Sequence, residues 1–279
     1  MGCESESSWE TGFFKLFGLA SPRLDVRWEP SPSDVVDRMI AMAKVRAADI
    51  VYDLGCGDGR CVITAAKQKG AHAVGIDLDP KRIKECGENA LREQVDGLVR
   101  FLNADFFHAD IGEASVLFLF LFPNVNLRLR PKLLAELRPG ARIVSYCHDM
   151  ERWMPDERTE VRANSLYLWI VPANVSGRWE GAMQAKGRGL SVRLELQQQF
   201  QTASGTARLG DEVFSLLRVS LEGNRFRCNG LESIHGDSVI LTGSVKGDLM
   251  EGVVQKDGVP GETCAWTARR DPATRRSLA

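Results

Sequence analysis

The chain has 279 residues, of which 44% are hydrophobic and 26% charged, so it can bury one large core or two smaller ones. Its formal net charge of −1 at pH 7 argues against a global field that attracts nucleic acid or an anionic membrane. Seven cysteines are dispersed without a CxxC pair, which argues against a zinc ribbon or a disulfide framework and predicts a reducing, cytoplasmic location.

The N-terminal region, residues 1–24, begins with an acidic polar stretch and is predicted to be a partly disordered leader. No apolar run approaches the roughly 18–20 residues that span a bilayer, so no transmembrane segment is expected. Gly2 and Cys3 are similar to the start of an acylated protein, but Glu6 stands where the myristoylation pattern needs serine or threonine. Peripheral membrane attachment through this end is left open.

Residues 25–172 alternate short apolar segments with amphipathic ones, which is typical of βαβ units on a mostly parallel sheet. The pattern predicts an α/β, Rossmann-like domain that closes with an antiparallel hairpin. Strands are expected over 49–54, 72–78, 99–105, 114–122 and 142–147, helices over 31–43, 61–69, 80–94 and 130–137, and the hairpin around 158–163 and 165–173.

After Pro172 the helical periodicity ends, and about eight short alternating segments follow. In "LSVRLELQQQF", for example, the leucines and Val192 alternate with polar residues, as in a half-buried strand. Residues 173–270 are therefore predicted to form a small antiparallel barrel or sandwich. The basic tail, residues 271–279, is predicted to be disordered.

The stretch "VYDLGCGDGR" places three glycines, Gly55, Gly57 and Gly59, at a strand–helix turn. The dinucleotide fingerprint is G-x-G-x-x-G, so the shorter G-x-G-x-G spacing argues against NAD or FAD. Asp53, just before the loop, disfavours a phosphate and suits a positively charged ligand end. S-adenosylmethionine carries an ammonium and a sulfonium and no phosphate, so we expect it as the cofactor.

Acidic residues end the next two predicted strands as well. Asp77, followed by Leu78, is expected to accept hydrogen bonds from both ribose hydroxyls. Asp105 is expected to receive the adenine amino group, with Phe106 packed on the ring. Carboxylates at three neighbouring strand ends would line one crevice at the carboxyl edge of the sheet, where α/β folds bind ligands.

Residues 25–171 resemble class I S-adenosylmethionine-dependent methyltransferases. More narrowly they resemble the small prokaryotic protein-lysine methyltransferases and their mitochondrial relatives, which methylate the ATP synthase c-subunit and the adenine nucleotide translocase. The matching pieces are "EPSPSDVVDRM", "VYDLGCGDGR", "GIDLDP", "NADFF", "FPNVNLRLRPKLLAELRPGARIVS" and "LYLWIVP". The chain departs from that pattern at Trp28-Glu29-Pro30, where a tyrosine is usual, and at Tyr146-Cys147, where a histidine and an acidic residue are usual.

The resemblance implies methylation of a protein lysine by in-line transfer, without a metal. Asn124 and Asn126, on a loop after the fourth strand stiffened by Pro123, are expected to aim the acceptor amine. The alternative for Asn126 is that it caps the next helix. Trp28, Glu29 and Pro30 are expected to form the opposite, substrate-binding wall. His148 and Asp149 are interpreted as a surface-loop pair rather than an acid–base couple.

The second domain has Gly177-x-Trp179 on its first strand and Trp266-Thr-Ala-Arg269 on its last, which resemble lipocalin-like barrels where a late arginine covers an opening tryptophan. We expect this β-domain to dock a partner or substrate, and no nucleic acid is expected. The alternatives are a small-molecule methyltransferase, a catalytically weak cofactor-binding protein that acts through its β-domain, and, remotely, a dehydrogenase.

Overall fold

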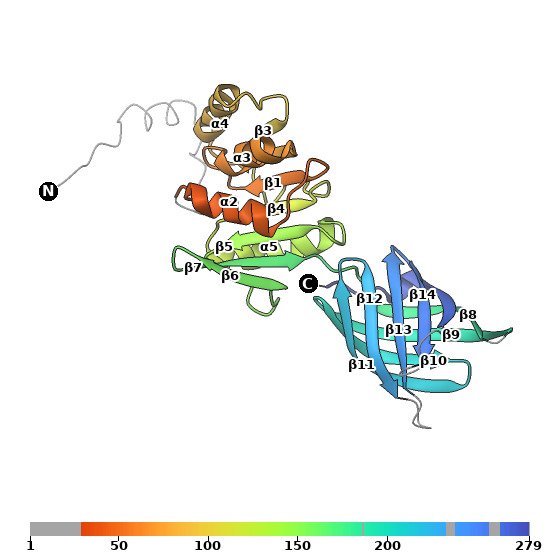
Figure 1. The fold of residues 1–279 in the computed structure, drawn as a ribbon. Helices are drawn as coiled ribbons and strands as arrows, with labels where there is room; N and C mark the ends of the chain where they lie inside the picture. The colour runs from red at the N-terminus through yellow and green to blue at the C-terminus, as the bar shows by residue number, and fades with distance from the viewer. Residues whose placement is uncertain (1–28, 186, 233–237, 257–262, 279) are drawn as a thin grey trace.

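The computed structural model describes residues 29–185, 187–232, 238–256 and 263–278. The expected leader and Trp28 therefore lie outside the described residues. The described chain forms an α/β part and a β-barrel that lie side by side (Figure 1). No helix within these segments is long and apolar enough to cross a membrane.

The α/β part is one seven-stranded sheet in the order β3-β2-β1-β4-β5-β7-β6. Only β7 runs against its neighbours, β5 and β6, which confirms the predicted mostly parallel sheet with a closing hairpin. The strands are β1 (Ile50–Leu54), β2 (His72–Asp77), β3 (Val99–Asn103), β4 (Val116–Leu119), β5 (Arg142–Tyr146), β6 (Glu157–Val161) and β7 (Asn164–Ile170).

Helices cover both faces of this sheet, so its central strands are buried on both sides. Apolar residues of α2 (Ser33–Met42) and α3 (Arg60–Lys69) pack on one face, beside α4 (Pro80–Arg92). Those of α5 (Pro123–Glu136) pack on the other. The strand order and helix cover place the carboxyl ends of β1, β2 and β4 at one edge.

The start of α5 corrects the expected helix over 130–137. The helix begins earlier, with Pro123 in its first turn, and Pro131 lies inside it. The amide of Asn126 already donates to the carbonyl of Phe122 at 3.1 Å. Pro123, Asn124 and Asn126 therefore lie on the first turns of a helix and not on a loop.

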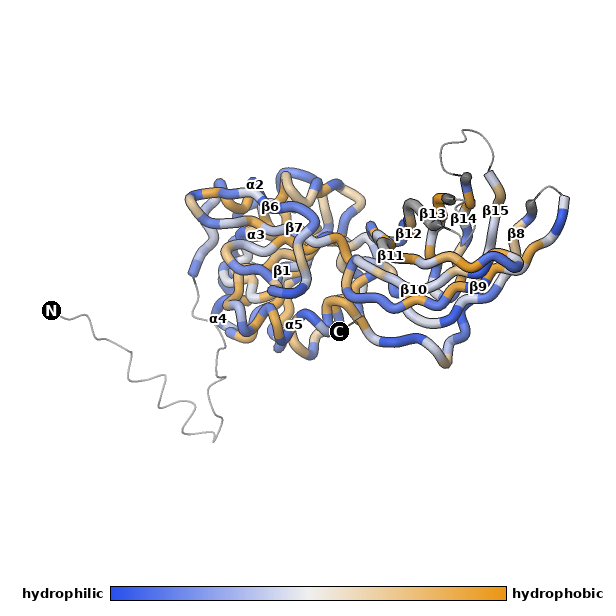
Figure 2. Tube along the Cα trace, turned by 90° about the horizontal axis from the view of Figure 1, so that it is seen from below, coloured by the Kyte–Doolittle hydropathy of each residue, from blue (hydrophilic) through white to orange (hydrophobic). Residues whose placement is uncertain are grey.

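The second part is a closed antiparallel barrel in the order β10-β11-β12-β13-β14-β15-β8-β9, so the barrel and not the sandwich is formed. Hydrophobic and hydrophilic residues alternate along its strands (Figure 2). The buried apolar side chains of these strands form one core cluster that fills the interior. The strands are β8 (Gly177–Ala185), β9 (Arg188–Gln199), β10 (Thr202–Leu209), β11 (Glu212–Glu222), β12 (Arg225–Glu232), β13 (Ser238–Lys246), β14 (Leu249–Lys256) and β15 (Thr263–Arg270).

A buried arginine does cover Trp179, but it is Arg270 and not Arg269. The period-2 alternation of β15 turns Trp266, Ala268 and Arg270 inward and leaves Arg269 exposed. The Arg270 guanidinium lies 4.7 Å from the Trp179 ring centre and forms a 2.6 Å ion pair with Asp248. Burial lowers the pKa of Arg270, and the neighbouring Asp248 carboxylate opposes that shift.

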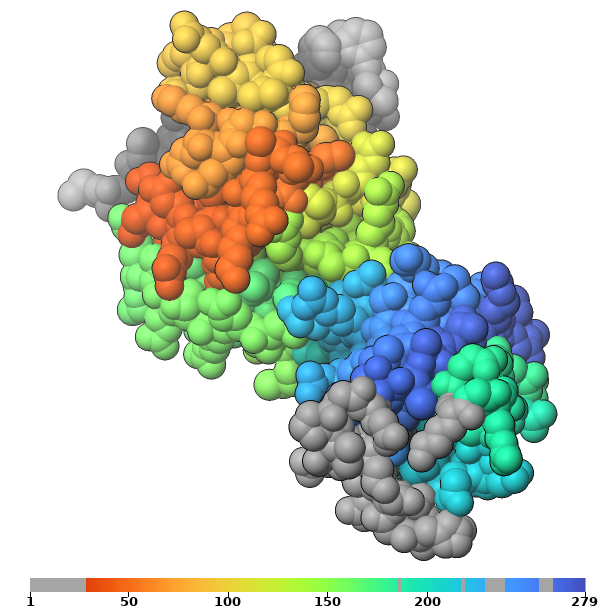
Figure 3. All heavy atoms as spheres, turned by 45° about the vertical axis from the view of Figure 1, so that its right-hand side comes forward, coloured from red at the N-terminus to blue at the C-terminus, as the bar shows by residue number. Residues whose placement is uncertain are grey.

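The barrel is joined to the sheet through residues 171–176, between β7 and β8. The amide of Ala173 donates to the carbonyl of Gly223 at 2.7 Å, which ties this connection to the barrel. The Ser176 hydroxyl donates to the carbonyl of Arg276 at 2.9 Å, so the residues before β8 meet those after β15. The tail, which was expected to be disordered, instead forms a 3-10 helix, η1 (Pro272–Thr274), and buries Leu278 in the apolar core of the sheet domain. In Figure 3 the barrel strands in cyan and blue lie against the green part of the sheet domain.

Candidate functional site

The loop after β1 requires its glycines for backbone conformation and for close packing against neighbouring side chains. Gly55, Gly57 and Gly59 have φ values of +79°, +56° and +80°, a region that other residues rarely adopt. The amide of Gly55 donates to the carbonyl of Ile76 at 2.8 Å, so the loop folds over the end of β2. A Cβ on Gly59 would lie 2.9 Å from the Phe101 ring.

Asp77 fixes the neighbouring strand end. One carboxylate oxygen accepts from the Gly57 amide at 2.9 Å, and the other accepts from the Asp79 amide at 3.0 Å. The side chain is thus held at the tip of β2, beside the loop, and each oxygen keeps a further acceptor position for a ligand hydroxyl. Leu78 follows, half-buried, and its carbonyl accepts from the side-chain amide of Asn103 at 2.9 Å.

Asp53 is a buried carboxyl at the base of the same loop. Burial raises its pKa to about 7, a hydrogen bond with Cys61 opposes the shift, and the charges of Asp77 and Asp58 add to it. A cationic ligand group would favour the ionised form. A glycine loop beside a carboxyl that a cation would ionise fits the ammonium end of S-adenosylmethionine.

Asp105 and Phe106 follow β3. The Asp105 carboxylate is engaged by its own turn, whereas the Phe106 ring contacts the glycine loop. The Asp105 carboxylate accepts from the Phe107 amide at 2.8 Å and lies 3.0 Å from the Nδ1 atom of His108, so it caps its own turn. The Phe106 ring lies 4.0 Å from where a Cβ on Gly55 would be, so it packs over the glycine loop. Contact with an adenine remains a prediction for both.

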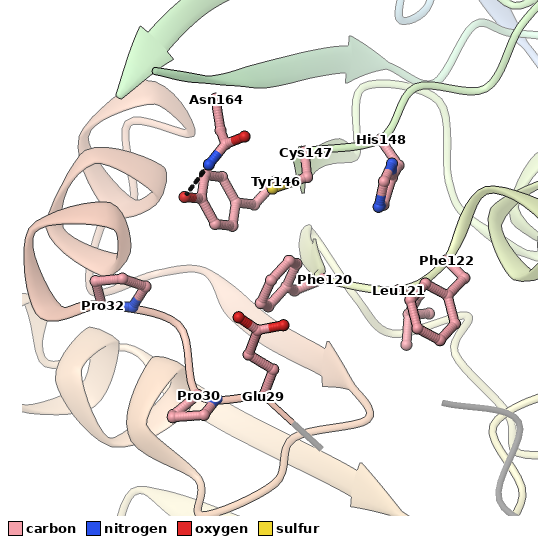
Figure 4. A pocket seen from close by; sticks show the side chains of 10 residues that line it. All are labelled: Glu29, Pro30, Pro32, Phe120, Leu121, Phe122, Tyr146, Cys147, His148 and Asn164. Carbon is pink, nitrogen blue, oxygen red and sulfur yellow. Dashed lines mark hydrogen bonds between the residues drawn. The ribbon is translucent and has the colours of Figure 1, made fainter. Parts of the chain in front are cut away.

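A cavity of about 700 Å³ opens beside this loop (Figure 4). Three of its residues, Glu29, Pro30 and Phe120, also line a smaller hollow that reaches Asp53 and the glycine loop, so the two spaces adjoin. The cavity is lined by Glu29, Pro30, Pro32, Phe120, Leu121, Phe122, Tyr146, Cys147, His148 and Asn164.

Three consecutive residues, Tyr146, Cys147 and His148, line this cavity although strand neighbours alternate in direction. Strand β5 ends at Tyr146, and Cys147 then adopts a φ of +69°, which breaks the alternation. The Tyr146 oxygen accepts from the Asn164 side-chain amide at 3.1 Å, and burial raises the pKa of this phenol. His148 lies on the loop after β5, as expected, and it also lines the cavity, whereas the exposed Asp149 does not.

The three residues proposed from the sequence as catalytic do not line the cavity. Pro123 and Asn124 are exposed on the first turn of α5. Asn126 is fully buried, and its amide donates to the Ser145 hydroxyl and the His148 carbonyl, both at 3.3 Å. It thus neither caps the helix nor faces the cavity, and it supports the backbone of a residue that does.

Comparisons with known proteins match the sheet domain. A family model described as the ANTKMT methyltransferase domain matches residues 53–157, which end before the barrel. A protein-lysine N-methyltransferase of Saccharolobus islandicus (strain REY15A) is 43% identical over 151 residues, covering 52% of this chain and 94% of that protein. An ATP synthase c-subunit lysine N-methyltransferase of Mus musculus is 35% identical over 144 residues, covering 52% of this chain and 58% of that protein.

A solved structure also matches the sheet domain. It is described as an RNA methyltransferase from Salinibacter ruber in complex with S-adenosyl-L-homocysteine, the demethylated cofactor. The two chains are 46% identical with a TM-score of 0.52, and the match covers 53% of this chain and 96% of that one.

The sheet and its glycine site therefore define an S-adenosylmethionine-dependent methyltransferase. Within that class, the chain belongs to the protein-lysine N-methyltransferase family.

Proposed function

We propose that the protein transfers a methyl group from S-adenosylmethionine to the side-chain amine of lysine in a protein acceptor. The observation that carries this proposal is a cavity that adjoins the cofactor loop and combines a carboxylate with aromatic rings. The cofactor supplies an electrophilic methyl group on a sulfonium. The nitrogen–carbon bond forms as the sulfur–carbon bond breaks, and the amine proton leaves to water.

The acceptor cavity suits a lysine amine in both protonation states. Glu29 and the rings of Phe120 and Tyr146 would attract the ammonium as it enters. Its deprotonation costs about 4–5 kcal/mol at pH 7, and a neighbouring positive charge from the cofactor lowers that cost. The Tyr146 oxygen, held by Asn164, keeps a lone pair that would accept an N–H and orient the neutral amine.

The remaining predicted residues keep proposed roles on this framework. Asp53 and the three loop glycines would hold the amino-acid end of the cofactor, Asp77 and Leu78 the ribose, and Asp105 and Phe106 the adenine. On the acceptor side, Pro30 would form a wall with Glu29. Asn124 and Pro123, at the start of α5, would border the approach, and Asn126 would act through His148.

Replacing Tyr146 by phenylalanine is expected to lower kcat/KM for the acceptor about tenfold, because one hydrogen bond to the amine is lost. The affinity for S-adenosylmethionine should not change, since the ring remains packed 4.9 Å from Phe120. Methyl transfer into host extract measures the first quantity and calorimetry the second. Tyr167→Phe, on strand β7 outside the cavity lining, is the matched control; equal losses in both variants would contradict the role of Tyr146.

The acceptor class is tested with tritiated S-adenosylmethionine and extract of the host. We expect the label in protein, and methylated lysine after acid hydrolysis. Label in RNA would instead favour RNA methylation, the activity named for the Salinibacter ruber protein. A net charge of −1 provides little attraction for such a polyanion. Label confined to low-mass compounds would favour a small-molecule acceptor, and no label would favour the catalytically weak alternative.

Two further expectations remain part of the proposal. The six described cysteines are free thiols, which supports a reducing compartment such as the cytoplasm. The barrel interior is filled by its own side chains, which supports docking through its outer surface rather than a ligand held inside, as lipocalins hold one.

A further inference from the structure

One connection runs from the acceptor cavity to the barrel. Residues 147–156, which we call the crossing segment, link β5 to β6. The segment begins with Cys147 and His148 in the cavity. Further along, the carbonyl of Met154 accepts from the side-chain amide of Gln201, a barrel residue, at 2.6 Å. The same ten residues thus touch both the proposed acceptor and the second domain.

The main barrel contact of the crossing segment is Phe200, in the turn between β9 and β10. Its ring stacks on Trp153, with ring centres 5.9 Å apart and an interplanar angle of 11°. It is only 8% exposed and belongs to the apolar core of the sheet domain. Arg130 of α5 lies 5.3 Å from the same ring and donates to the Met150 carbonyl at 2.9 Å.

The backbone at Phe200 indicates that this side chain is retained for its contact. The turn has two residues, because Gln199 pairs directly with Thr202. Phe200 adopts a φ of +52°, where such turns favour glycine or asparagine and a bulky residue is strained. A residue held in an unfavourable backbone conformation is usually retained because its side chain makes a stabilising contact. Here that contact is the packing of the Phe200 ring in the apolar core of the sheet domain.

Hydrogen bonds to its carbonyls hold the backbone of the crossing segment, including one of 2.7 Å from the Trp169 indole to the Trp153 carbonyl, whereas the Trp153 side chain is held by packing. In the described part of the chain, the Trp153 indole nitrogen and the Arg130 Nε atom are buried without a hydrogen-bond partner. Burial of an unpaired donor is costly, and water would satisfy both atoms if it could enter. Removing the Phe200 ring would open a path for water and favour release of the segment.

We propose that Phe200 is a positioning residue for methyl transfer: from the barrel, it holds the crossing segment so that Cys147 and His148 keep the shape of the acceptor cavity. The catalytic part of this inference rests on the proposed function, whereas the structural part can be measured without an acceptor. The barrel is then a support of the methyl-transfer site as well as a candidate docking module.

The thiol of Cys147 reports directly on the cavity, and Cys264 on the barrel provides an internal reference. Both are partly exposed, and the other four described cysteines are buried. In Phe200→Gly, which also relieves the turn, we expect N-ethylmaleimide to modify Cys147 about tenfold faster, read by peptide mass spectrometry. The rate at Cys264 should not change. Phe200→Leu keeps apolar packing and should show a smaller increase, and Val213→Ala, a partly exposed barrel change, should show none.

Kinetics complete the test. With host extract as acceptor, Phe200→Gly should raise the apparent KM for acceptor protein several-fold and leave the dissociation constant of S-adenosylmethionine unchanged. An unchanged rate at Cys147, or equal increases at Cys147 and Cys264, would overturn the proposal, because the ring would then have no specific effect on the cavity. A wild-type protein that labels nothing would contradict the proposed function, and the thiol rates would still decide the positioning role.

Discussion

The affinity for S-adenosylmethionine is expected to fall about tenfold for each pH unit below 7 and to level off above it. Burial raises the pKa of Asp53 to about 7, so below that pH the free protein holds this carboxyl protonated. Binding of a cationic group beside Asp53 requires the ionised form, and each bound ligand must then release one proton. Calorimetry between pH 5.5 and 8 measures the slope.

Asp53→Asn is the control for this pH dependence. The amide has nearly the same shape and no proton to lose, so the variant should bind more weakly at pH 8 and show a flat profile through pH 7. A flat profile in the wild-type protein would mean that Asp53 does not face the cationic end of the cofactor. A slope that persists in Asp53→Asn would assign the titration to another group.

Asp77→Ala is expected to weaken S-adenosylmethionine binding at least about a hundredfold. The carboxylate anchors the Gly57 amide and is proposed to accept the ribose hydroxyls, and hydrogen bonds to a charged group contribute about 1.5–3 kcal/mol each. Calorimetry at pH 8 measures the loss. Asp96→Ala, an exposed aspartate, is the matched control. Binding by Asp77→Ala within twofold of the wild type would contradict the proposed placement of the cofactor.

The cofactor half of the site could be predicted because its signals are local. Gly55, Gly57 and Gly59 lie within five residues, and Asp77 ends a strand whose apolar pattern is clear. The parallel sheet then brings these strand ends to one edge. Asp105 followed from the same rule, although its carboxylate has partners in its own turn that no spacing pattern indicates.

The proposed acceptor half could be predicted only in part: Glu29 and Pro30, expected on the substrate-binding wall, do line the cavity, but most of its other residues were not expected there. Its side chains come from distant segments around Glu29, Phe120, Tyr146 and Asn164. The positive φ of Cys147, which turns three consecutive residues to one cavity, has no sequence signature because cysteine is not a typical left-handed residue. The departure from the family pattern at Tyr146 and Cys147 was the available signal, since a changed residue pair at a strand end marks a position open to specificity.

Ser176 and Arg276, which flank the barrel on its two sides, lie in contact, and this has a consequence for how the two parts depend on each other. A domain whose flanking residues lie close together is easily transplanted between chains, as modular architectures require. Yet Phe200 completes the apolar core of the neighbouring unit, so excising the barrel would bare the Trp153 surface to solvent. The barrel is therefore a separate unit along the chain, but the sheet domain depends on it to cover an apolar surface.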